Sequence, residues 1–136
     1  MKYIVSSEEE TIQIAQNLAQ QVSCGTVIAL YGTLGAGKTA FCRGFIQSLT
    51  HQSTKVPSPT FTLLQIYDTP LYPVYHFDMY RLKTPDEAYE IGIEDAFAEG
   101  VCLIEWPEKL GYLLPKKHIS VTIDILPDKK RQITIE

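Results

Sequence analysis

The chain has 136 residues, which suits one domain of ordinary size and excludes a multidomain machine. Hydrophobic residues make up 45% of it and charged residues 21%, a composition typical of a soluble globular protein rather than a disordered or fibrous one. The formal net charge of −4 argues against autonomous nucleic-acid binding, because such binding depends on clustered Lys and Arg that neutralise phosphates.

The sequence carries no signal for a membrane, for secretion or for disulfides. Apolar stretches such as 27–31 and 101–104 are far shorter than the roughly 18–20 residues of a membrane span. The acidic run at residues 8–10 fits neither a secretory signal nor an Arg-rich transit peptide. The three cysteines are scattered without C-x-x-C spacing, which disfavours a zinc site and a disulfide framework. We therefore expect a cytoplasmic protein with reduced thiols and no membrane contact.

The first part of the chain predicts a strand, a helix and a second strand. Tyr3 to Val5 indicates a short edge strand, and Ser7 with Glu10 matches the capping box S-x-x-E that opens a helix. Apolar residues then recur at three- and four-residue intervals, and Gly25 is placed to end the helix as its C′ glycine. Residues 26–31 form a continuous apolar run, typical of a strand covered on both faces in a parallel sheet.

The middle of the chain predicts a loop, a helix and two strands. Residues 32–37 are a glycine-rich loop, and the helix that follows carries apolar residues on one face up to Leu49. Pro57 and Pro59 then force an extended segment. Two strands are expected over 63–67 and 71–78, joined at Thr69-Pro70, and Pro73 indicates an edge position for the second strand.

The last part of the chain completes an α/β pattern. Thr84 to Glu87 predicts the opening of a short helix, with Thr84 as N-cap, and residues 101–105 read as a second buried strand that ends in an acid. Residues 119–125 and 133–135 alternate apolar and polar positions around a Pro127-Asp128 turn, which predicts an antiparallel hairpin. Residues 1–136 should therefore form a single α/β domain. Its central sheet should be largely parallel, with helices on both faces and an antiparallel C-terminal hairpin.

The glycine-rich loop carries the chemistry. Residues 32–39 fit G-x-x-x-x-G-K-[ST] without deviation, between a predicted strand and a predicted helix, which makes the domain a P-loop NTPase. Successive backbone N–H groups of such a loop converge on phosphate oxygens at a helix N-terminus. The loop residues predicted to contact the nucleotide are Thr33, Leu34, Gly35, Ala36, Gly37, Lys38 and Thr39. Lys38 should reach the β- and γ-phosphates, and the Thr39 hydroxyl should bind Mg2+. The alternative is a glycine turn that binds nothing.

A magnesium–nucleotide site also needs an acid on a neighbouring strand, and two apolar runs end in one. We expect Glu105 to bind the metal directly or through water, with a capping or solvated carboxylate as the alternative. Asp78 ends the other run. Trp106 either lines the nucleotide pocket or belongs to the core. His76 shares a strand face with Asp78 and Tyr80, where a packing role is more typical than catalysis.

The choice of nucleotide and the reaction class follow from what the sequence lacks. Neither Asn-Lys-x-Asp nor Thr-Lys-x-Asp occurs, so ATP is favoured over GTP. Arg43, Arg81 and Arg131 are the only arginines, which makes a small-molecule kinase with an Arg-rich lid less attractive. Because such an arginine usually stabilises the transition state of phosphoryl transfer, its scarcity predicts a slow ATPase that awaits a partner.

Four motifs in this order give the chain a family resemblance. They are the phosphate loop, Ser58-Pro59-Thr60-Phe61, the run from His76 to Leu82, and Glu105-Trp106. Over nearly its whole length the chain resembles the TsaE (YjeE) family, bacterial P-loop ATPases required for making threonylcarbamoyladenosine next to the anticodon of tRNAs that read codons beginning with A. The resemblance implies a Mg-dependent ATPase that binds the TsaD–TsaB heterodimer, meets tRNA only through that complex and does not itself transfer the threonylcarbamoyl group.

The resemblance also assigns roles to matching residues. It makes Lys38 the phosphate ligand, Thr39 and Glu105 the magnesium ligands, and Asp78 an essential acid near the metal or the attacking water. Lys38, Asp78 and Glu105 are therefore the expected catalytic residues. Thr60 would be a switch-like residue that contacts the nucleotide, although from its neighbours alone it is equally a turn residue.

Near the adenine, the resemblance places Ser7 and Arg131. Two departures from the family pattern stand out. Thr33 occupies a loop position where an acidic or amide residue is more usual, and the sequence stops soon after Ile135, which leaves a C-terminal partner contact in doubt. Two rival functions stay open from the residues: a binding module that needs ATP occupancy but not hydrolysis, and a small-molecule kinase.

Overall fold

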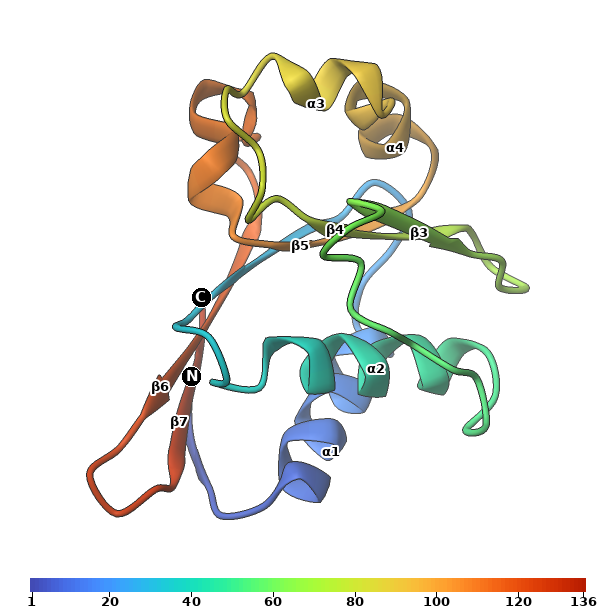
Figure 1. Ribbon diagram of the computed structural model, residues 1–136. Helices are drawn as coiled ribbons and strands as arrows, with labels where there is room; N and C mark the ends of the chain where they lie inside the picture. The colour runs from blue at the N-terminus through green and yellow to red at the C-terminus, as the bar shows by residue number, and fades with distance from the viewer.

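The computed structural model describes residues 1–136 as seven strands and a set of helices (Figure 1). The strands are β1 (Lys2–Val5), β2 (Val27–Tyr31), β3 (Leu64–Tyr67), β4 (Val74–Asp78), β5 (Val101–Glu105), β6 (Ile119–Ile125) and β7 (Arg131–Ile135). The helices are α1 (Glu8–Ala19), α2 (Lys38–Leu49), α3 (Glu87–Glu90), α4 (Ile93–Glu99) and the 3-10 helix η1 (Pro107–Leu113). All strands join in one sheet of order β1-β7-β6-β2-β5-β4-β3.

The centre of the sheet is parallel and its margins are antiparallel. β2 pairs in parallel with β5 and β6, and β5 pairs in parallel with β4. β7 runs antiparallel to β6 and β1, and β3 runs antiparallel to β4. Every residue of β5 is buried, as expected for a strand covered on both faces. The predicted α/β domain with a largely parallel central sheet and an antiparallel C-terminal hairpin is confirmed.

Helices cover both faces of the sheet and enclose two cores (Figure 1). On β5, Val101 and Leu103 belong to the core formed with α1 and α2, whereas Cys102 and Ile104 belong to the core formed with α3, α4 and η1. This alternation follows from the two-residue period of a strand. Glu105 continues the series on the α2 face. The strand period therefore turns its carboxylate towards the helix that follows the glycine-rich loop.

α1 and α2 pack closely at Gly44. A Cβ atom there would lie 2.9 Å from both Cα and the carbonyl oxygen of Ile12, closer than real Cβ contacts come. We expect Gly44→Ala to lower the free energy of unfolding by about 1–3 kcal/mol, because the contact is with backbone and no rotamer change can relieve it. Alanine's better helix propensity, worth about 1 kcal/mol, would otherwise make the variant more stable. Urea unfolding measures the difference, and an unchanged or higher stability would contradict this packing.

Helix α1 ends earlier than the sequence predicts. It stops at Ala19, with Gln20 as C-cap, so Gly25 is not its C′ residue and that prediction is wrong. Gly25 has a φ of 95° in the turn that leads into β2, and its N–H donates to the carbonyl of Gly100 at 2.8 Å. The positive φ is therefore used to enter the sheet rather than to end a helix. The start of α1 is as predicted, because the Ser7 hydroxyl accepts from the N–H of Glu10.

Two other boundaries differ from the sequence prediction. β4 begins at Val74, directly after Pro73, and β3 forms the edge of the sheet on this side, so the edge position inferred from Pro73 is wrong. A proline just before a strand removes no ladder hydrogen bond, which explains why it is tolerated beside a central strand.

Thr84 is not the N-cap of α3, which starts at Glu87; the Glu87 carboxylate nevertheless accepts from the N–H of Thr84 at 3.3 Å. No sequence pattern predicted α4, which buries Ile93 and Ala96 in the second core.

Candidate functional site

The glycine-rich loop lies at the carboxyl edge of the parallel strands. Residues 32–37 connect the end of β2 to the start of α2, and β4 and β5 end beside them with Asp78 and Glu105 in register. Gly35 and Gly37 have φ values of 80° and 113°, which only glycine adopts without strain. Gly37 is the N-cap of α2, and no side chain caps this helix. Its first N–H groups are therefore available to an anion.

The side chain of Lys38 bends back onto the loop that precedes it. Its side chain is buried, and Nζ donates to the carbonyl of Gly32 at 2.6 Å while lying 3.5 Å from the centre of the Trp106 ring. Burial lowers the pKa of Lys38, and the nearby carboxylate of Glu105 opposes that shift. Trp106 has left-handed backbone angles (φ 56°, ψ 50°) directly after β5, and its ring also packs on Tyr80. A buried ammonium group therefore lies at the head of α2.

Thr39 and Glu105 are in direct contact. The Thr39 hydroxyl lies 3.2 Å from each carboxylate oxygen of Glu105, which is only 3% exposed. The same carboxylate receives Nε2 of His76 at 2.7 Å. A hydroxyl and a buried carboxylate side by side supply the hard oxygen atoms that Mg2+ prefers. The oxygen donors of Thr39 and Glu105 therefore fit a magnesium ion.

Asp78 forms a second acidic centre beside Glu105. Its Oδ2 accepts from the Thr60 hydroxyl at 3.1 Å, and its Oδ1 accepts from the backbone N–H of Tyr80 at 3.0 Å. Since Thr60 donates to Asp78, the hydroxyl of Ser58, 2.7 Å away, donates to Thr60. Both carboxylates are nearly buried, and the ammonium of Lys38 balances only one of them. The remaining negative charge favours a bound cation.

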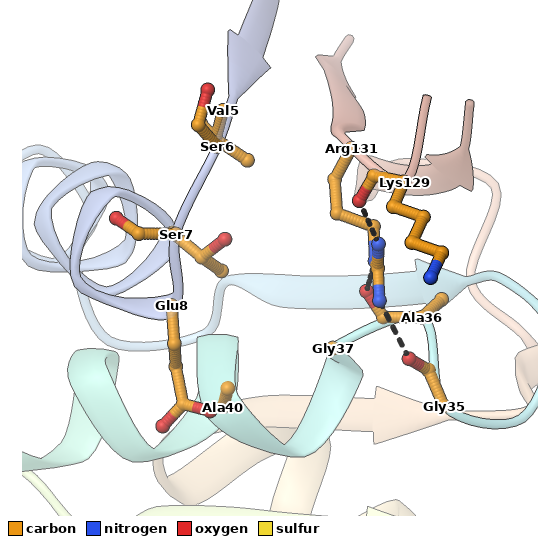
Figure 2. A pocket seen from close by; sticks show the side chains of 11 residues that line it. Val5, Ser6, Ser7, Glu8, Gly35, Ala36, Gly37, Ala40, Lys129 and Arg131 are labelled. Carbon is orange, nitrogen blue, oxygen red and sulfur yellow. Dashed lines mark hydrogen bonds between the residues drawn. The ribbon is translucent and has the colours of Figure 1, made fainter. Parts of the chain in front are cut away.

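Two cavities flank the loop and share Gly35, Gly37 and Ala40 in their walls. The first, of about 230 Å³, is called the acid cavity here; its wall includes Leu34, Lys38, Thr39, Thr60, Asp78, Glu105 and Trp106. The second, of about 270 Å³, is called the arginine cavity; its wall includes Ser7, Glu8, Lys129 and Arg131. Figure 2 shows the arginine cavity between the start of α1 and the turn that precedes β7, with the loop across its floor.

Most residues predicted to hold the nucleotide line one of these two cavities. Those on the metal and phosphate side gather around the acid cavity, and Ser7 and Arg131 lie on the other side of the loop. Thr33 lines neither cavity; its carbonyl accepts from the N–H of Ala36 at 3.1 Å and shapes the loop. No site role was predicted for Ser58, whose hydroxyl donates to Thr60, or for Lys129, which lines the arginine cavity. Ser58 was part of the Ser58-Pro59-Thr60-Phe61 motif, which was the available signal for it.

Arg131 is bound to the loop backbone. Its Nε donates to the carbonyl of Ala36 at 3.1 Å and its Nη2 to that of Gly35 at 3.4 Å, while Nη1 donates to Lys129 (Figure 2). Because the C=O and N–H of one trans peptide point in opposite directions, a carbonyl of Ala36 held by Arg131 turns the N–H of Gly37 away from the guanidinium. Arg131 therefore fixes the orientation of a loop N–H group.

Arg131→Ala should weaken ATP binding by about 1–2 kcal/mol, because the loop loses the hydrogen bonds that orient its peptides. Calorimetric titration with Mg-ATP measures this change. Lys130→Ala removes the same charge from an exposed neighbour and is the matched control. Equal affinities for the two variants would show that charge alone, and not the contact with the loop carbonyls, carries the effect.

No helix of the protein combines the length and the apolar character that crossing a membrane requires. The longest, α1 and α2, have 12 residues each.

Comparison with known proteins gives the family. The model of a family described as "Threonylcarbamoyl adenosine biosynthesis protein TsaE" matches residues 5–133. The tRNA threonylcarbamoyladenosine biosynthesis protein TsaE of Rickettsia bellii is 45% identical over 132 residues, covering 97% of this chain and 92% of the relative. The protein of the same name from Bacillus subtilis is 38% identical over 135 residues, covering 98% and 84%.

A solved structure agrees with the sequence relatives. The crystal structure of Bacillus subtilis YdiB matches with a TM-score of 0.84 and 34% sequence identity, covering 99% of this chain and 83% of that chain. The similarity extends through the glycine-rich loop, the acidic strand ends and the C-terminal hairpin, because it includes nearly every residue. These findings confirm the resemblance drawn from the four sequence motifs: the chain belongs to the TsaE family.

Proposed function

We propose that this protein is the ATP-binding and ATP-hydrolysing component of bacterial tRNA threonylcarbamoyladenosine synthesis, acting with a TsaD–TsaB heterodimer in the cytoplasm. Membership in the TsaE family supports the role in this pathway. One observation supports the hydrolytic activity above all. The head of α2 offers Lys38 and Thr39 in the same acid cavity as two buried carboxylates, Asp78 and Glu105.

The substrate would bind across the loop. Backbone N–H groups at the start of α2 and the ammonium of Lys38 would hold the phosphates. The acid cavity would take the γ-phosphate, and the arginine cavity, with Ser7 and Arg131 in its wall, has room for the nucleoside. Lys38 would exchange its bond to the Gly32 carbonyl for phosphate oxygens. Trp106, whose ring centre lies 3.5 Å from Nζ, would then pack beside the stem of the lysine.

Glu105 and Asp78 would have different roles in hydrolysis. Glu105 and Thr39 would hold Mg2+, which when bound neutralises charge on the β- and γ-phosphates. Asp78 keeps lone pairs free beyond those used by Thr60 and Tyr80, and it would accept a proton from the attacking water. Thr60 holds Asp78 and belongs to the segment between α2 and β3. As a switch-like residue, Thr60 would therefore make the position of this segment depend on whether the γ-phosphate is present.

Phosphate release tests this proposal. Wild-type protein with Mg-ATP should produce free phosphate slowly, and faster when the TsaD–TsaB heterodimer is added. Phosphate transferred to a small-molecule acceptor would instead show a kinase. If a non-hydrolysable ATP analogue fully restored tRNA modification by the heterodimer, the protein would be a nucleotide-gated binding module. No hydrolysis under any of these conditions would overturn the proposed activity.

A further inference from the structure

His76 is a completely buried histidine whose two ring nitrogens differ in their surroundings. Its Nε2 lies 2.7 Å from Oε2 of Glu105, whereas its Nδ1 is buried without any hydrogen-bond partner. An ionised carboxylate can only accept, so the short contact requires a proton on Nε2. Nearly all buried polar atoms have partners, and an unpartnered one costs free energy. The contact of Nε2 with Glu105 therefore has to offset the free-energy cost of leaving Nδ1 buried without a partner.

The strands bring His76 and Glu105 together. Asp78 on β4 pairs directly with Glu105 on β5, and His76 lies two residues earlier on β4, on the same face. This makes His76 and Glu105 diagonal neighbours, within reach of long side chains. Oε2 of Glu105 thus accepts from His76 inside the protein and from the Thr39 hydroxyl on the loop side, at 2.7 and 3.2 Å. The carboxylate is held between the sheet and the head of α2.

The neighbouring Cys42 does not turn this group into a second metal centre. Ligand atoms of Cys42, His76 and Glu105 lie within 4.8 Å of one another. Burial raises the pKa of the Cys42 thiol well above its usual range, and an uncharged thiol is a poor metal ligand. Cys42 therefore packs against the pair, and Glu105 provides the negative charge that faces the imidazole.

From these contacts we infer that His76 is a positioning residue for Glu105. Its Nε2–H fixes one carboxylate oxygen and so aims the group at the place beside Thr39 where a divalent cation would be held. The inference rests on the proposed function, because it assigns Glu105 the role of a magnesium ligand. Residues that orient a metal ligand in this way usually raise metal affinity by restricting the ligand to its binding geometry.

Two amide variants separate this role from general packing. In His76→Gln the side-chain nitrogen takes the place of Nε2 and keeps the donor to Glu105, whereas in His76→Asn it takes the place of the unpartnered Nδ1. ATP affinity measured by calorimetry with Mg2+ and with EDTA gives the gain due to the metal. We expect His76→Asn to reduce this gain by roughly 10–100-fold and His76→Gln to retain most of it, with equal affinities in EDTA. His51→Asn, at an exposed position, is the control.

The wild-type protein provides an independent measurement. Because the chain has only three histidines, the ring of His76 can be assigned in nitrogen–proton NMR spectra. A proton on a buried Nε2 exchanges slowly with water, so its one-bond nitrogen–proton coupling can be observed. An Nε2 without a proton would overturn the inference, even if neither variant folds. Equal metal-dependent gains for wild type, His76→Gln and His76→Asn would also overturn it while leaving the proposed function intact. Loss of any metal dependence in the wild type would instead refute the proposed function and this inference together.

Discussion

Lys38→Ala should nearly abolish ATP hydrolysis, with a decrease of about 10²–10³-fold, and weaken ATP binding by about 1.5–3 kcal/mol. The physical reason is that Lys38 brings the one ammonium group at the head of α2 into the acid cavity. Without it, the triphosphate would approach two buried carboxylates with no positive side chain between them. Phosphate release and calorimetric titration with Mg-ATP measure the two effects.

Two further variants control the Lys38 experiment. Lys38→Met keeps an unbranched stem that can pack on Trp106 but removes the charge, so it should behave like alanine in hydrolysis while preserving more of the stability. Lys55→Ala removes one positive charge from an exposed position and should leave ATP binding unchanged. Hydrolysis by Lys38→Met at the wild-type rate would contradict the proposed role of the ammonium group.

Glu105→Gln should change activity and stability in opposite directions. Hydrolysis should decrease by about 10²–10³-fold, because a neutral amide is a weaker ligand for Mg2+. The free energy of unfolding without nucleotide should rise by up to about 1 kcal/mol, because like charges directly opposite on neighbouring strands destabilise a sheet. Glu105 and Asp78 form such a pair, and both are buried. This loss of stability is the kind of cost that a functional site imposes on a fold, and it fits the proposed binding of a cation between the two carboxylates.

Metal removal and a surface variant make this result specific. In EDTA, ATP should bind to Glu105→Gln at least as well as to the wild type, because the lost ligand matters only when Mg2+ is present and the variant removes one negative charge from the acid cavity. Glu94→Gln makes the same chemical change at an exposed position of α4 and should alter neither hydrolysis nor unfolding. A Glu105→Gln protein that was both inactive and less stable would indicate that the carboxylate mainly supports the fold.

The loop and the strands around it could be predicted because local rules determine them. The pattern of residues 32–39 requires glycine at specific backbone angles, and continuous apolar runs mark β2 and β5. Asp78 and Glu105 could be singled out as candidate acids because each ends an apolar run. These rules need only the nearest residues in sequence, so they do not depend on how the chain packs.

Features that depend on contacts between residues far apart in the chain could not be predicted from the sequence. Gly25 suits the end of a helix equally well as the turn it makes, and the choice depends on its bond to Gly100 on another segment. Arg131 reaches the loop from a position 95 residues after Ala36, which no local pattern reveals. The contact between His76 and Glu105 likewise depends on the register of two strands. Tertiary packing, rather than propensity, decides each of these.

The cation–π contact between Lys38 and Trp106 makes the tryptophan an intrinsic fluorescence probe. Trp106 is the single tryptophan of the chain, so all indole emission arises at one point in the wall of the acid cavity. An ammonium group 3.5 Å from the ring centre perturbs that emission through its electric field. When the lysine turns towards a phosphate, the wavelength and yield of the light should change with it. If the proposed ATP binding is correct, stopped-flow fluorimetry of the unlabelled protein should therefore time the arrival and departure of the nucleotide.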